Sequence, residues 1–255
     1  MMHTFGVQLR KELLELWRTK KVIVVLAVLV GFGFASPILA KLLPDMLEAM
    51  GEDQMGGVQI VIPEPSTKDA IDQFEKNMVQ FGLLLAVLMS FNAIVSEREH
   101  GQAALMFPHP LPRELFVVAK FAALALLFGV GLILGAAAAY GYTVLLFDAP
   151  DAGGFLALVG LIYLWILSLI AVSLLASALG RTVASAGGIA FVFLIVFLLA
   201  GSFTNLAPDK ITAWGHALAI NADSPARWGA LAVTLVITAA AVGGSAMVLR
   251  RQEIG

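Results

Sequence analysis

Reactive side chains gather in one polar island of this chain, residues 96–120, which lies between two long apolar runs. The carboxylates of Glu97 and Glu99 and the imidazoles of His100 and His109 stand close together there, among several prolines. Carboxylates and imidazoles are side chains that commonly transfer protons or bind metal ions in proteins. The island is therefore the first place to look for chemistry.

The sequence nevertheless lacks the motifs that such chemistry requires. None of the four histidines falls in an apolar run, and no His-Glu-x-x-His occurs. The absence of cysteine excludes disulfides, thiolate metal sites and a cysteine nucleophile. No Gly-x-x-x-x-Gly-Lys loop for ATP phosphates occurs either. We expect no enzyme activity and no catalytic, cofactor or metal site in this chain. The island is interpreted as a docking surface, with an ordinary solvated loop as the alternative.

The composition points to a membrane protein. Hydrophobic residues make up 60% of the chain and charged residues 13%, with a mean hydropathy of +0.91, whereas soluble domains carry about 25% charged residues. Six apolar runs contain no Asp, Glu, Lys, Arg or His, and each is close to the roughly 20 residues with which a helix spans a bilayer. The expected fold class is all-α integral membrane, with six transmembrane helices.

The expected layout is a single transmembrane domain over residues 1–255. Its first helix, 5–18, is amphipathic, with Phe5, Leu9 and Leu13 on one arc and charged residues opposite, and should lie along the membrane interface. The spans are expected at about 22–43, 77–96, 114–147, 154–180, 183–203 and 228–249. The outer loops are expected at 44–76 and 204–227.

The distribution of charge orients these spans. With both termini in the cytoplasm, the inner segments hold 11 of the 16 basic residues and 6 of the 18 acidic residues. The inner face then carries a charge of +5 and the outer face −7, as the positive-inside rule requires. The island is therefore expected on the cytoplasmic side. Because the six uncharged runs contain no ionisable residue that an ion gradient could act on, energy for transport would have to come from another subunit.

The island itself should be structured. Glu97 and Glu99 end a helix, where the macrodipole disfavours acidic side chains by about 0.3 to 1 kcal/mol each, so they should have partners. The basic residues of the first helix are suitable partners: Arg10, Lys11 and Arg18. Gly101 can end the helix, and residues 102–107 are long enough for a short helix that the following prolines stop.

These residues resemble a known family, the ABC-2 type transporter permeases, which are the membrane subunits of ATP-binding-cassette exporters. The resemblance rests on Glu97-x-Glu99-x-Gly101 followed by Leu105, Pro110, Arg113 and Lys120. It implies a type-2 ABC exporter architecture in which the segment 97–113 couples the permease to an ATPase. The residues implied as the coupling contacts are Gly101, Gln102, Ala104, Leu105, Met106, Phe107, Pro110 and Arg113. Pro112 stands where the family usually has a serine.

The same resemblance implies the partners and the location. The chain would pair with two ATPase subunits, which bind ATP and magnesium, and with a second permease copy or paralogue. The twelve spans of the two permeases would surround a path for export through a prokaryotic plasma (inner) membrane. No nucleic acid and no cofactor in this chain are expected. Residues 205–223 would form short re-entrant helices, as the loop before the last span often does in this family.

Two other functions remain open from the sequence. A membrane scaffold or assembly factor without transport of its own also fits spans without charge, and a carrier driven by an ion gradient would require a pH- or sodium-dependent flux. Polar residues of two spans could line a substrate path, although such residues are more often contacts between helices. They are Gln80, Asn92, Tyr163 and Ser168.

Overall fold

The computed structural model describes residues 2–54, 64–99 and 113–251. These ranges contain nine helices and no strand. In chain order the helices are α1 (Met2–Arg18), α2 (Lys21–Gln54), α3 (Thr67–Ser90), α4 (Val95–Glu99), α6 (Arg113–Leu146), α7 (Ala152–Leu179), α8 (Val183–Phe203), α9 (Lys210–Ala219) and α10 (Trp228–Arg251). The protein is an all-α integral membrane protein, because six helical stretches of this part of the chain are long and apolar enough to cross a membrane.

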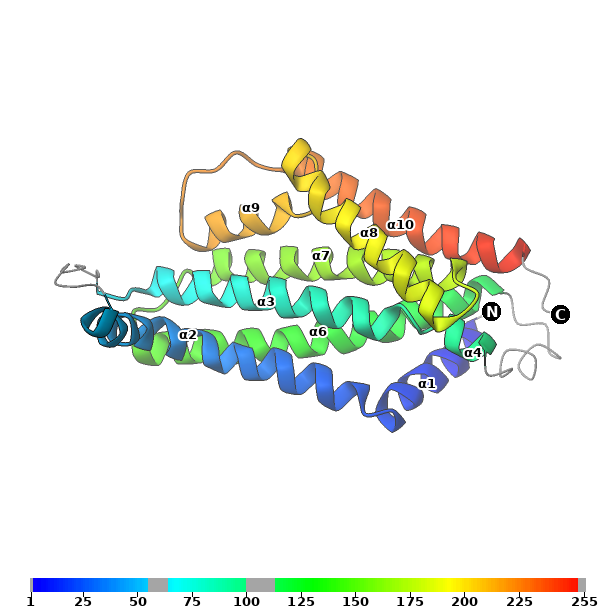
Figure 1. The fold of residues 1–255 in the computed structure, drawn as a ribbon, viewed down its shortest axis with the longest axis horizontal. Helices are drawn as coiled ribbons and strands as arrows, with labels where there is room; N and C mark the ends of the chain where they lie inside the picture. The colour runs from blue at the N-terminus through cyan, green and yellow to red at the C-terminus, as the bar shows by residue number, and fades with distance from the viewer. Residues whose placement is uncertain (1, 55–63, 100–112, 252–255) are drawn as a thin grey trace.

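The long helices α2, α3, α6 and α7 run side by side, and α8 and α10 cross them obliquely (Figure 1). One end of the bundle, the α4 end, gathers α1, α4, the start of α6 and the turn between α7 and α8. The other end, the α9 end, holds the last turns of α2 and α6 and the start of α7. Helix α7 is the centre of the bundle: 56% of its most apolar stretch is buried, against 17% for α8.

Small residues allow α2 and α6 to cross closely. A β-carbon on Gly33 would lie 2.7 Å from the Cα of Gly135, and one on Gly135 would lie 2.6 Å from the Leu29 carbonyl oxygen. Real β-carbons do not approach backbone atoms so closely, so only glycine fits at these two positions. The spacing of Gly131 and Gly135 in the sequence is therefore part of a helix contact, since a β-carbon on Gly131 would also meet Leu29.

Helix α1 is joined to α2 by a tight elbow and turns its polar side inward. Lys20 adopts a positive φ of 59°, and its N–H bonds to the Trp17 carbonyl, which ends α1 as αL residues commonly do. Gln8 and Glu12 are buried against the protein, whereas Trp17 is 66% exposed. The exposed apolar residues of α1 also include Val7, Leu13 and Leu14.

The outer segments contain more helix than the expected loops at 44–76 and 204–227. Helix α2 continues through Pro37 and Pro44 to Gln54, and α3 begins at Thr67. The N-cap residue Ser66 donates its backbone N–H to Asp69 at 2.8 Å, which stabilises the first turn of α3. The second loop contains one short helix, α9, which packs along α7; re-entrant helices in this loop stay a prediction.

The second expected span, 77–96, is not one continuous helix. Helix α3 ends at Ser90, residues 91–94 form a turn, and α4 starts at Val95. The sequence gives no sign of a break at this place, because residues 83–96 contain neither proline nor glycine, and Gly82 lies well before the end of α3. The reason lies in a side chain of α7, described below.

Candidate functional site

Helix α4 is five residues long and lies immediately before the segment 100–112, which is outside the described residues. Three consecutive charged residues, Glu97, Arg98 and Glu99, bind different neighbours from it. We call α4 and the groups bound by these residues the α4 junction. It joins α1, α6 and the α7–α8 turn at a single point.

Glu97 is the centre of a buried ion-pair network. Its Oε1 accepts hydrogen bonds from Lys120 Nζ of α6 at 2.5 Å and from Lys11 Nζ of α1 at 2.9 Å. Lys120 also reaches Glu12 Oε2 of α1 at 2.8 Å. Glu12, Glu97 and Lys120 are each at most 5% exposed. Two acids and two lysines balance in charge, so the network avoids the large cost of an unpaired buried charge.

The surroundings of the network strengthen it. Gln8 donates to Glu12 at 2.9 Å, and Lys120 Nζ lies 4.9 Å from the centre of the Phe116 ring, in range for a cation–π contact. Burial acts to lower the pKa of Lys11, but its hydrogen bond to Glu97 and the charges of Glu12, Glu97 and Glu15 outweigh this and hold the pKa above the usual value for lysine. Lys11 therefore stays charged at any physiological pH.

Three carboxylates of this region share one lysine. Glu12, Glu15 and Glu97 bring oxygens within 4.8 Å of one another. The Nζ of Lys11 lies 2.9 to 3.2 Å from each of these side chains, so the lysine supplies the positive charge that a metal ion would otherwise supply.

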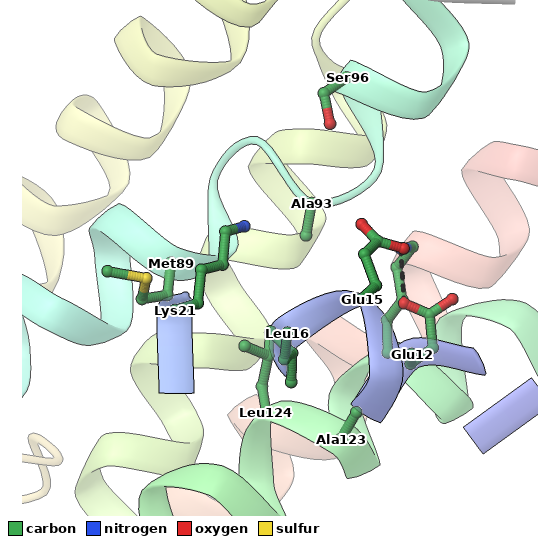
Figure 2. Close-up of a pocket in the computed structure, with 10 residues that line it drawn as sticks. Glu12, Glu15, Leu16, Lys21, Met89, Ala93, Ser96, Ala123 and Leu124 are labelled. Carbon is green, nitrogen blue, oxygen red and sulfur yellow. Dashed lines mark hydrogen bonds and ion pairs between the residues drawn. The ribbon is translucent and has the colours of Figure 1, made fainter. Parts of the chain in front are cut away.

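A pocket of about 30 Å³ opens beside the network, and Figure 2 shows the residues that line it. Lys21 and Met89 lie on one side of it, with Glu12 and Glu15 on the other. The pocket is far below the roughly 300 to 1,000 Å³ of small-molecule sites. It can hold a water molecule and does not qualify as a site for a transported compound.

Arg98 and Glu99 bind the two sides of the α7–α8 turn. One guanidinium nitrogen of Arg98 donates to the carbonyls of Ser177, Ala178 and Gly180 at 3.0, 3.1 and 2.6 Å. Glu99 accepts from the N–H of Val183, the first residue of α8, at 3.1 Å. A cation at the end of α7 and an anion at the start of α8 are both placed favourably for the helix dipoles.

A side chain of α7 holds the break between α3 and α4. The fully buried Ser177 accepts from the N–H groups of Ile94 at 3.0 Å and Val95 at 3.1 Å. These two N–H groups would bond to carbonyls of α3 if the helix were continuous. The serine therefore replaces the missing helix bonds.

The structure brings some of the expected partners together and separates others. Lys11 meets Glu97 as expected, but Glu99 does not contact the first helix, because α4 turns it toward Val183. Arg10 and Arg18 form no ion pair with Glu97 or Glu99 among the described residues. Sequence reasoning also missed Glu12 and the role of Lys120, although Lys120 belongs to the motif and Glu12 stands one helical turn after Gln8.

Most of the implied coupling contacts lie outside the described residues. These are Gly101, Gln102, Ala104, Leu105, Met106, Phe107 and Pro110. Arg113 is the first residue of α6. The structure therefore describes the two helices that flank the segment 100–112, which are α4 and α6.

The four residues considered for a substrate path have separate surroundings. Tyr163 donates to the Ala125 carbonyl at 2.9 Å, and the buried Ser168 donates to the Trp165 carbonyl at 2.6 Å. Both hydroxyls thus donate hydrogen bonds to helix backbone carbonyls, as polar residues in membrane helices commonly do. Gln80 is exposed on α3, and Asn92 lies in the break before α4.

Comparison with known proteins gives the class of this membrane protein. Residues 8–213, from α1 into α9, match the family described as ABC-2 family transporter protein. The chain belongs to this family, which is that of multi-pass membrane subunits of ABC transporters, in general partnered by an ATPase. It is also 25% identical over 178 residues to the uncharacterized transmembrane protein YxlG of Bacillus subtilis, a match that covers 70% of this chain and 69% of that protein.

Proposed function

We propose that the chain is the permease subunit of an ABC exporter in a prokaryotic plasma membrane. It works with a second permease copy or paralogue and two ATPase subunits, which bind ATP and magnesium. The chain itself carries no enzyme activity. Each described span lacks an ionisable residue in its middle, which supports an energy supply from outside the spans.

The observation that carries this proposal is the α4 junction. Both ends of the segment 100–112 enter it: Glu97 precedes the segment, and Lys120 follows it by two turns of α6. A force on the segment would therefore act on α1, α6 and the α7–α8 turn at once. This is the arrangement needed if an ATPase docks on the segment and drives the spans from there.

Charge supports the proposed orientation. The α4 end holds the basic residues counted for the cytoplasmic side, including Arg250 and Arg251 at the end of α10. Under the positive-inside rule this end, with both termini, faces the cytoplasm, where ATP is available. The α9 end then faces outward and is the exit side.

The test is co-purification of the chain from native membranes, identification of a bound ABC ATPase, and measurement of ATP hydrolysis by the complex. Leu105→Asp or Phe107→Asp should lower the hydrolysis rate at least tenfold, because a charge replaces an apolar docking side chain. Lys41→Asp, which places the same acid on an exposed position toward the α9 end of α2, is the matched control and should leave the rate unchanged.

Three outcomes decide against the proposal. An intact complex whose rate is unaltered by both substitutions would remove the coupling role of the segment. A chain that assembles with other membrane proteins but never with an ATPase would favour the scaffold function. Purified chain that supports a pH- or sodium-dependent flux without an ATPase would indicate a carrier.

A further inference from the structure

Helix α4 is attached more firmly to the α7–α8 turn than to α3, the helix that precedes it. Arg98 binds three carbonyls at the end of α7, and Glu99 binds the first N–H of α8. Ser177 adds the N–H groups of Ile94 and Val95. Six hydrogen bonds therefore fasten α4 and the preceding residue, Ile94, to the end of α7 and the start of α8, across about 80 residues of sequence.

The connection of α4 back to α3 is weaker. The regular helix bonds are interrupted where Ile94 and Val95 donate to Ser177. Two buried polar atoms in this stretch, Ser90 Oγ and Asn92 Oδ1, have no hydrogen-bond partner among the described residues. Such atoms raise the energy of the present arrangement and favour a segment that can rearrange.

The contact with α1 and α6 differs in kind from the contact with the turn. Among the described residues, the ion pairs of this contact go to the carboxylate of Glu97, which is held by Lys11 and Lys120. Lysine side chains are long and rotatable, so they can keep an ion pair while the helices shift. In the contact with the turn, the carbonyl and N–H partners are fixed to the backbone, so only the side chains of Arg98 and Glu99 can adjust.

We infer that α4, the last turn of α7 and the α7–α8 turn move as one unit, hinged at residues 91–93, with Ser177 and Arg98 as the positioning residues that hold the unit together. The inference rests on the proposed function and adds which helices move when the ATPase acts. A force on the segment after α4 is then passed to α8, the least buried span, while α3 remains packed against α2 and the rest of α7. Gly187 of α8 packs against the Phe91 ring at the hinge, which keeps α8 in contact with the pivot.

The first experiment needs the permease alone. Amide hydrogen exchange is measured in the full chain in lipid nanodiscs, for wild type, Ser177→Ala and Ser173→Ala. Exchange at Ile94 and Val95 should be about tenfold faster in Ser177→Ala, the factor that corresponds to losing a hydrogen bond of about 1.4 kcal/mol. Ser173→Ala, one turn earlier on α7 and also buried, should not change it. Unchanged or slower exchange in Ser177→Ala would overturn the role of Ser177.

The second experiment tests whether the unit moves as one. The chain has no cysteine, so Glu99→Cys/Val183→Cys can be joined by a short bifunctional thiol reagent before the ATPase is added. The uncrosslinked variant has lost the bond from Glu99 and should hydrolyse ATP severalfold more slowly than wild type in the complex. Cross-linking should restore at least half of the wild-type rate. A rate that stays low or falls further would show that α4 must slide along the turn, and would overturn the inference.

The two proposals fail in different ways. If no ATPase binds the chain, the proposed function is wrong, while the exchange experiment still tests the hinge. If the complex forms and hydrolyses ATP but cross-linking inhibits it, the function stands and the inference is wrong.

Discussion

Lys120 Nζ lies 2.5 Å from Glu97 Oε1, and the two side chains are 3% and 4% exposed. This pair joins the helix before the segment 100–112 to the helix after it. The free energy of a buried pair depends on both partners, because a single remaining charge is stranded in a poorly solvated site. Stability measurements can therefore show how much of the α4 junction depends on it.

Lys120→Met leaves Glu12 and Glu97 with Lys11 as their only cation within the network. We expect the free energy of unfolding to fall by about 3 to 5 kcal/mol, measured by denaturant titration in detergent micelles. Adding Glu97→Gln should recover part of this loss, because the remaining charges then balance. Arg10→Gln, on the exposed side of α1, should stay within about 0.5 kcal/mol of wild type. A double variant no more stable than Lys120→Met would contradict the ion-pair account.

Gly33→Ala should force α2 and α6 apart, since its β-carbon would lie 2.7 Å from the Cα of Gly135. Backbone cannot yield as a flexible side chain can, so we expect a loss of about 1 to 3 kcal/mol or more in the same titration. Gly31→Ala has no neighbouring atom within 4 Å and should be neutral or stabilising by up to about 1 kcal/mol. Equal effects of the two substitutions would mean that the close crossing does not matter for stability.

Gly154→Ala should loosen α9, because the new β-carbon would lie 2.8 Å from the carbonyl carbon of Leu218. Amide exchange over α9 should then become about tenfold faster, as expected for an overpacking cost of about 1.4 kcal/mol. Gly160→Ala, on the same helix with open space around it, serves as the control. Unchanged exchange over α9 in Gly154→Ala would show that this contact does not hold α9 in place.

Trp17 should lie in contact with lipid, since it is 66% exposed beside other apolar residues of α1 and tryptophan favours the membrane interface. Phospholipids brominated near the head group should quench most of its fluorescence, measured as the difference between wild type and Trp17→Phe. The same difference for Trp165→Phe should show little quenching, because Trp165 is 1% exposed. Quenching of Trp17 as weak as that of Trp165 would place α1 away from the interface.

The sequence by itself determined the class of fold and the number of spans. Apolar runs without charge can exist as stable helices in lipid, so their length and count follow from composition alone. The sequence also indicated that Glu97 needs a partner, because an acid at a helix end is unfavourable, and Lys11 is one of its partners in the structure. These properties depend on neighbours along the chain or on the solvent, which a sequence displays directly.

Only the tertiary structure decided which residues the α4 junction binds. Glu99 binds Val183, and Ser177 binds Ile94, across more than 80 residues of sequence. Such contacts depend on which helices lie side by side and on the rotation of each about its axis. In a membrane the lipid-facing side of a helix is as apolar as the side that packs against other helices. The periodicity of apolar residues therefore does not reveal how each helix is rotated about its axis. The break before α4 and the partner of Glu99 follow from that packing.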